Sequence, residues 1–147
     1  MKILKILTLI LCAAFVANQG TAQVSFTNQN GLLNGSNYSG VAIAVTDANN
    51  DLLDDIIRLN GANELNIQYQ TPGGGAFTEY SYGNVSPQRQ WCLSAADCNN
   101  NGFADFMMGD YTHSRYIVSD ATGTNFSAAE FPGNDFFAQG SNFADIN

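Results

Sequence analysis

The sequence predicts an all-β protein assembled from repeated units of four short strands. Three observations predict this class. The chain repeats itself about every 49 residues, apolar runs of strand length alternate with turn sequences, and no segment beyond residue 22 keeps a helical periodicity. Four strands in roughly 40–50 residues is the pattern of one blade of a β-propeller. We therefore expect antiparallel blades in a partial ring, about two complete ones with flanking strands.

The segment 1–22 is predicted to be a secretory signal peptide. A basic start at Lys2 and Lys5 precedes an apolar run over residues 6–16, and small residues follow at 20–22. That run rises only about 16 Å as a helix, roughly half the hydrocarbon core of a bilayer. We expect cleavage before Gln23, no membrane insertion of the mature chain, and a secreted, periplasmic or cell-surface location.

The charge balance limits the classes of partner. All thirteen acidic residues lie beyond residue 22, where only three cationic side chains stand: Arg58, Arg89 and Arg115. Binding to phosphate needs a basic face, so the sequence argues against nucleic acid and disfavours anionic lipid. With 12% charged and 45% hydrophobic residues, the composition favours a folded domain over a disordered chain.

Aspartate and phenylalanine mark the period of the repeat. Three aspartates open acidic loops at nearly equal spacings along the chain: Asp47, Asp97 and Asp145. Three phenylalanines precede these aspartates at a nearly constant separation: Phe26, Phe77 and Phe126. Because two independent markers share one period, we divide the repeat region 23–147 into units 26–76, 77–125 and 126–147, the last incomplete.

Within these units, strand signals alternate with turns. Residues 41–45 form an apolar run typical of a buried inner strand, and residues 64–69 alternate polar and apolar side chains as a half-buried strand does. Glycine and asparagine at 60–63 and 71–75 provide turns. We expect strands over 41–45, 55–59, 64–69 and 77–82, over 106–109, 116–119 and 126–128, and a leading edge strand over 24–27.

The acidic loops resemble those of the FG-GAP, or VCBS-type, repeat family, found in integrin α-chain propellers and in many secreted bacterial proteins. The motif D-x-[DN]-x-[DN]-x-x-x-D with two apolar residues after it begins at Asp47 and again at Asp97, and the likeness covers residues 26–147. In this family such loops bind calcium. The resemblance implies three ligand sets: Asp47, Asn49, Asp51 and Asp55 with the Leu53 carbonyl; Asp97, Asn99, Asn101 and Asp105 with the Phe103 carbonyl; and Asp145 and Asn147 in an incomplete third loop.

The residue types in these loops suit a hard cation. Calcium takes six to eight oxygen ligands, and Asp or Asn at alternate positions can direct oxygens toward one point. The loops begin like an EF-hand, but Arg58 and Met108 stand where its bidentate glutamate belongs. Leu52 stands where the second loop has Gly102, which costs roughly 1–2 kcal/mol if the backbone there is left-handed. The alternative is a hydrogen-bonded Asx-rich turn without metal.

Two cysteines remain after the signal segment. In an oxidising compartment, Cys92 and Cys98 predict a disulfide, and the alternative is a pair of small buried thiols. Zinc is not expected, because His113 is the only histidine.

No catalytic motif is present, so we expect a non-enzymatic scaffold for recognition or adhesion. Its partner would be an extracellular glycan or protein, and five aromatic side chains can offer stacking surfaces: Tyr80, Tyr82, Trp91, Tyr111 and Tyr116. The alternative is the non-catalytic propeller portion of a secreted polysaccharide-degrading or other hydrolytic enzyme. Because a ring needs roughly four to eight blades, we expect the chain to be the N-terminal part of a longer protein, with the remaining blades in cis.

Overall fold

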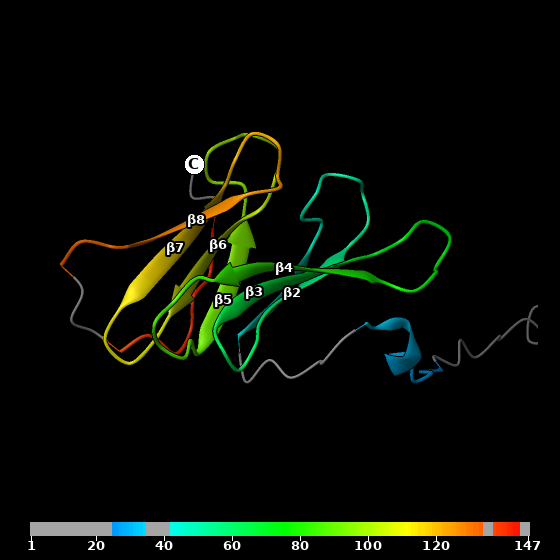
Figure 1. Ribbon diagram of the computed structural model, residues 1–147, viewed down its shortest axis with the longest axis horizontal. Coiled ribbons are helices and arrows are strands. Elements are labelled where there is room, and N and C mark those ends of the chain that lie inside the picture. Colours follow the sequence, from blue (N-terminus) through cyan, green and yellow to red (C-terminus); the bar gives the residue numbers. More distant parts are fainter. Residues whose placement is uncertain (1–24, 35–41, 134–136, 145–147) are drawn as a thin grey trace, which may run out of the picture.

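The computed structural model describes residues 25–34, 42–133 and 137–144, and it confirms the all-β class (Figure 1). The strands are β1 (Ile43–Thr46), β2 (Asp55–Leu59), β3 (Glu64–Tyr69), β4 (Thr78–Asn84), β5 (Cys92–Ala96), β6 (Asp105–Gly109), β7 (Ser114–Ser119) and β8 (Phe126–Glu130). They form two antiparallel sheets, β1-β2-β3-β4 and β5-β6-β7-β8. Helix in these ranges is limited to one 3-10 turn, η1 (Asn30–Leu32), and no helix among them is long and apolar enough to cross a membrane.

The strand predictions hold closely, with one exception. β2 and β3 have the predicted bounds, and most of the other predicted strands differ by one or two residues at an end. The predicted edge strand over 24–27 is wrong in its described part, because residues 25–29 form no strand and Phe26 is exposed. An isolated β-type sequence needs a partner strand for its backbone, and this segment has none among the described residues. The signal segment lies outside the described residues.

The second sheet repeats the first. Asp55 and Asp105 open β2 and β6, and each pairs with the last residue of the preceding strand, Thr46 or Ala96. Ile57 and Met107 are equivalent residues of the two units, but Ile57 pairs with Ile67 and Met107 pairs with Tyr116. The third strand of the second sheet therefore begins its pairing one residue earlier in the repeat. The last strand of each sheet, not the first, begins at or directly after a marker phenylalanine: β4 follows Phe77 and β8 begins at Phe126.

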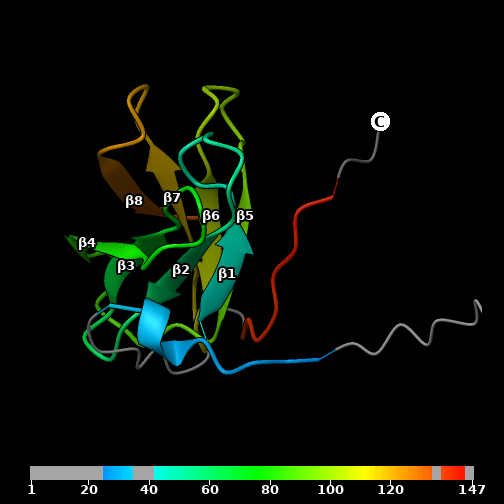
Figure 2. The same ribbon diagram turned by 90° about the vertical axis from the view of Figure 1, so that its right-hand side faces the viewer.

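The hydrophobic core lies between the two sheets. Figure 2 shows β1 beside β5, and these first strands are in contact. The buried apolar side chains come from both sheets: Ala42, Ala48, Ile57, Leu59, Leu65, Ile67, Leu93, Ala104, Phe106, Met108 and Ile117. Farther out, the ring of Tyr82 on β4 meets the ring of Phe126 on β8 edge to face, with centroids 4.7 Å apart. The sheets close no ring or barrel within the described residues.

The two sheets pack front to back. Side chains alternate between the faces of a strand, so Ile57 and Ile56 of β2 point to opposite sides. Ile57 is in the core, whereas its equivalent Met107 lies on the far face of the second sheet, near Phe131. Conversely, Phe106 joins the core while its equivalent Ile56 does not. The front of the first sheet thus meets the back of the second, which is the relation expected of consecutive members in a stack.

Candidate metal-binding loops

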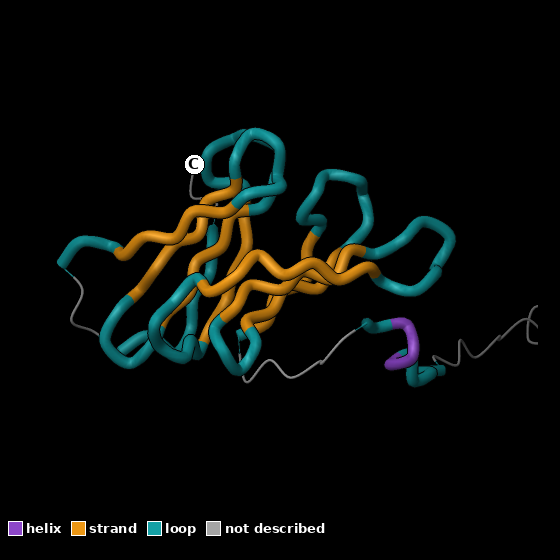
Figure 3. The backbone as a smooth tube through the Cα atoms, in the orientation of Figure 1, coloured by secondary structure: helices purple, strands orange, loops and turns teal. Residues whose placement is uncertain are grey.

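Two loops carry the predicted calcium ligands. The first acidic loop, residues 47–54, joins β1 to β2, and the second, residues 97–104, joins β5 to β6; both project from the same end of the sheets (Figure 3). The fourth residue of each loop is left-handed, with φ of 63° at Asn50 and 58° at Asn100. The sixth is also left-handed, with φ of 69° at Leu52 and 88° at Gly102. The two loops therefore share one backbone conformation.

The opening aspartate of each loop holds this conformation. Asp47 accepts the N–H of Asp51 at 3.1 Å with Oδ1 and the N–H of Leu52 at 2.8 Å with Oδ2. Asp97 makes the equivalent bonds to its loop, at 3.1 and 2.8 Å. Both carboxylate oxygens thus face the inside of the turn.

The side chains at the third and fifth positions also accept backbone N–H groups two residues ahead. The distances are 2.9–3.2 Å in four equivalent bonds: to Asn49 from Asp51, to Asp51 from Leu53, to Asn99 from Asn101, and to Asn101 from Phe103. These are Asx turns, in which the side chain replaces a backbone acceptor. The loops are built from side-chain oxygens turned toward their own backbone.

The last aspartate of each motif is buried and joins the loop to the sheet. Asp55 is fully buried and accepts the N–H groups of Ala48 and Gln70, both at 2.9 Å. Burial raises the pKa of Asp55, the two backbone hydrogen bonds oppose this, and the charges of Asp51 and Asp47 add to the rise. A cation bound in the loop would therefore favour the ionised form of Asp55.

Asp105 has the same role in the second loop. It accepts the N–H of Cys98 and both the N–H and hydroxyl of Ser119, all at 2.8 Å. The Asn101 amide adds a further tie, because it donates to the carbonyls of Ser119 and Asp120 at 3.1 and 3.0 Å. Hydrogen bonds from the side-chain amide of Asn101 therefore anchor the second loop to the β7–β8 turn.

The donor set fits calcium in its chemistry. Among the described residues, no group of three or more acidic, histidine or cysteine side chains gathers closely enough to hold a metal ion, because the loop carboxylates face backbone N–H groups. Each carboxylate oxygen that accepts one N–H keeps a second lone pair. Together with the Asn oxygens and the carbonyls of Leu53 and Phe103, these form an all-oxygen set of the kind calcium prefers. Asp145 and Asn147 lie outside the described residues.

The predicted disulfide is absent from the structure. Cys92 and Cys98 are both free thiols, the first buried and the second exposed. Cys92 begins β5, and Cys98 lies beyond the last residue of that strand, Ala96. An extended strand rises about 3.3 Å per residue, so β5 alone places its two ends about 13 Å apart, farther than the roughly 7 Å between Cα atoms that a disulfide spans.

Of the five aromatic residues considered for stacking, Tyr116 lines one cavity with Phe106, Phe131 and Phe143, whereas Tyr80 and Tyr82 line another with Tyr69 and Phe103. Sequence reasoning missed the last two. Tyr69 could have been found from the alternation of β3, which places it on the same face as Ile67. The approach of Phe103 depends on the packing of the two sheets and has no local signal.

Comparisons with protein-family models, with curated proteins and with solved structures found no match to this chain.

Proposed function

We propose that this chain is a secreted, calcium-binding β-propeller-repeat protein that serves as a scaffold for recognition or adhesion. The observation that carries the proposal is the shared conformation of the two acidic loops, because it includes a left-handed Leu52. A leucine there costs roughly 1–2 kcal/mol. Strained backbone of this kind persists where a site requires its geometry.

The charge of the first acidic loop supports a cation ligand. Four carboxylates stand close together in the sequence: Asp47, Asp51, Asp54 and Asp55. Their mutual repulsion destabilises the loop unless a positive charge offsets it. The second loop has only two carboxylates, those of Asp97 and Asp105, and hydrogen bonds from the Asn101 side-chain amide already hold it in place. Calcium should therefore bind there more weakly.

The arrangement of the sheets supports the propeller-repeat part of the proposal. Each sheet is a four-stranded antiparallel meander, the first strands of the two sheets are neighbours, and equivalent faces point the same way along the stack. Blades of a propeller relate to one another in this manner. Signal cleavage and export belong to the same proposal and rest on residues 1–22.

Thermal unfolding with and without calcium tests the proposal. Modules of this kind bind calcium with Kd of about 10⁻⁴–10⁻³ M. At ten times Kd, binding stabilises the fold by about 1.4 kcal/mol, which raises Tm by several degrees. We expect Asp47→Asn to remove most of this shift and Asp97→Asn to remove less.

Asp54→Asn is the matched control, because Asp54 lies in the first acidic loop, is exposed and is outside the predicted ligand set. It should keep most of the calcium shift of the wild-type chain and lose only the part that comes from its own charge. A wild-type Tm that does not respond to millimolar calcium would contradict the proposal and favour metal-free Asx turns.

A further inference from the structure

A cleft of about 610 Å³ opens between the two sheets on the side of the acidic loops. Four aromatic residues line it: Tyr69, Tyr80, Tyr82 and Phe103. Four polar residues complete the lining together with Gly123: Asn49, Thr78, Thr122 and Thr124. No charged side chain takes part among the residues that the structure describes. Each acidic loop contributes one residue, so the cleft adjoins both loops.

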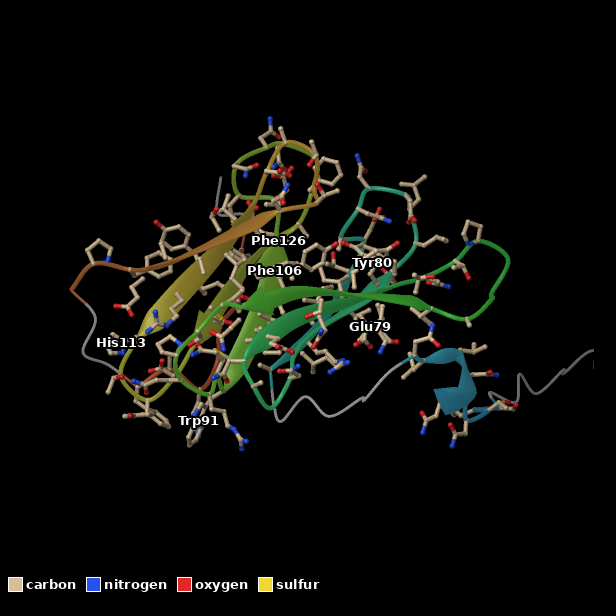
Figure 4. The ribbon with its side chains drawn as sticks, in the orientation of Figure 1. Glu79, Tyr80, Trp91, Phe106, His113 and Phe126 are labelled. Atoms are coloured by element: carbon tan, nitrogen blue, oxygen red, sulfur yellow. The ribbon has the colours of Figure 1, made fainter. Side chains whose placement is uncertain are left out.

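The tyrosines of the cleft form a fixed platform. Tyr80 is 55% exposed, and its ring lies edge to face against Tyr69, with centroids 5.8 Å apart and planes at 66°. Figure 4 shows Tyr80 on the opposite side of β4 from Glu79. Because Tyr69 and Tyr80 stand on neighbouring strands of one sheet, the ring is positioned before any ligand arrives.

Several hydroxyl groups line the same cleft as the Tyr80 ring. The hydroxyls of Tyr69 and Tyr82 lie 2.9 Å apart, so one donates to the other and one O–H stays available to a ligand. Burial, and then the bond to Tyr82, raises the pKa of Tyr69, which keeps the Tyr69 hydroxyl neutral. On the opposite wall, the hydroxyls of Thr122 and Thr124 are 2.6 Å apart. The cleft therefore pairs one exposed aromatic face with several neutral hydrogen-bonding groups.

We propose that this cleft binds a neutral saccharide, whose ring stacks on Tyr80 and whose hydroxyls bond to the tyrosine pair and to the threonines. The inference rests on the proposed recognition function and names its ligand class. A pyranose ring has an apolar C–H face that packs on an aromatic ring, with hydroxyls at its edge that need polar partners. The cleft supplies both.

Charge and shape disfavour two other classes of small ligand, anionic sugars and quaternary ammonium ions. The chain has a net charge of −8, and the lining contains no cation, so an anionic sugar such as a uronate is disfavoured. A quaternary ammonium ion needs several ring faces around it. Here the rings of Tyr69 and Tyr80 meet edge to face, and only Tyr80 is largely exposed among the four aromatic residues.

Calorimetric titration of the whole chain in calcium-containing buffer tests this inference. The neutral probes are cello-, xylo-, malto- and laminarihexaose, and the comparison probes are an oligogalacturonate and choline. We expect at least one neutral hexaose to bind, Tyr80→Ala to weaken it about tenfold or more, and Thr78→Val to weaken it several-fold. Tyr111→Ala is the matched control, because Tyr111 is 54% exposed and stands on the β6–β7 turn, outside the cleft.

Three results would overturn the inference: no binding of any neutral probe, tighter binding of the oligogalacturonate or choline, or an equal loss of affinity in Tyr111→Ala. Melting of the same samples with and without calcium separates this inference from the proposed function. A calcium shift without sugar binding defeats the saccharide site alone. Sugar binding without a calcium shift defeats the calcium proposal and leaves the cleft assignment standing.

Discussion

Leu52 and Gly102 hold the same left-handed backbone position in the two acidic loops, with φ of 69° and 88°. Each donates its N–H to the opening aspartate of its loop at 2.8 Å. The Leu52 side chain is 88% exposed, so its packing contributes little stability to offset the backbone strain. One loop therefore carries a residue suited to this position, and the other does not.

Exchange of these residues should change stability in opposite directions. Leu52→Gly should raise the free energy of unfolding by about 0.5–1 kcal/mol, because the relief of strain exceeds the added entropy of the unfolded chain. Gly102→Leu should lower it by about 1–2 kcal/mol. Urea denaturation measures both. Asn50→Gly is the control and should change little, since asparagine tolerates this region; a lower urea midpoint for Leu52→Gly would contradict the argument.

Gly123 should be intolerant of any side chain. It has a φ of 67°, and a Cβ there would lie 2.3 Å from the ring of Phe103. We expect Gly123→Ala to destabilise the fold by about 2–3 kcal/mol through overpacking and backbone strain. Gly73→Ala separates the two causes, because Gly73 has a φ of 84° but open space around it. Equal losses in the two variants would show that Phe103 does not pack against this turn.

Local patterns explain why much of the fold could be predicted. The two-residue alternation of 64–69 and the apolar run 55–59 predicted β3 and β2 within their bounds, because both signals depend on neighbouring residues. Comparison with Gly102 gave the left-handed backbone at Leu52 only as a condition, and the structure shows that this condition is met. The prediction of a strand over 24–27 was wrong in its described part, because a strand also requires a partner strand, and no local sequence pattern shows whether one is present.

Contacts between distant strands could not be predicted in the same way. The cleft depends on which faces of the two sheets meet, and one register step would send Tyr80 to the other side of β4. The ion pair of Arg58 and Glu79 likewise joins β2 to β4 across β3. Neither residue shows in the sequence that its partner stands two strands away.

This ion pair should be important for stability. Arg58 donates from Nη2 to both carboxylate oxygens of Glu79 at 2.9 Å, and Gln68 donates to the same carboxylate at 2.8 Å. The Arg58 side chain is almost fully buried, so Glu79→Gln should cost about 2–4 kcal/mol by removing the negative charge that Nη2 contacts. The double variant Arg58→Met, Glu79→Leu should recover most of this loss.

Glu130→Gln provides the comparison, because Arg115 is nearly as buried as Arg58 but its partner Glu130 is far more exposed to water than Glu79. It should cost less than about 1 kcal/mol in the same chemical denaturation. A loss as large as that of Glu79→Gln would show that burial does not decide the strength of these pairs.

Acid should destabilise the β6–β7 turn through Asp110. Burial of Asp110 raises its pKa, but hydrogen bonds from the N–H groups of Thr112 and His113 and from the Gln90 amide outweigh burial and hold the pKa below its ordinary value. A lowered pKa means that ionised Asp110 stabilises the fold above the unfolded value of about 3.8, and that this stability is lost as the pH falls through the folded value. Asp110→Asn should therefore be less stable at pH 7 and should lose less stability between pH 5 and roughly pH 2 than the wild-type chain. Parallel pH curves for the two proteins would contradict this assignment.

The two cysteines should react as separate thiols. Cys98 is exposed and should be alkylated by iodoacetamide in the folded chain. The reaction should be slow at neutral pH, because partial desolvation of the thiol, and then the charges of Asp105 and Asp97, raise the pKa of Cys98. Cys92 is buried and should react only after unfolding in denaturant without reductant. Peptide mapping by mass spectrometry distinguishes both from Cys12, which lies in the predicted signal segment, and Cys98→Ser confirms which thiol is labelled in the folded chain. If neither thiol is labelled in denaturant until a reductant is added, the two are bridged, and the start of β5 must then depart from the extended strand described above.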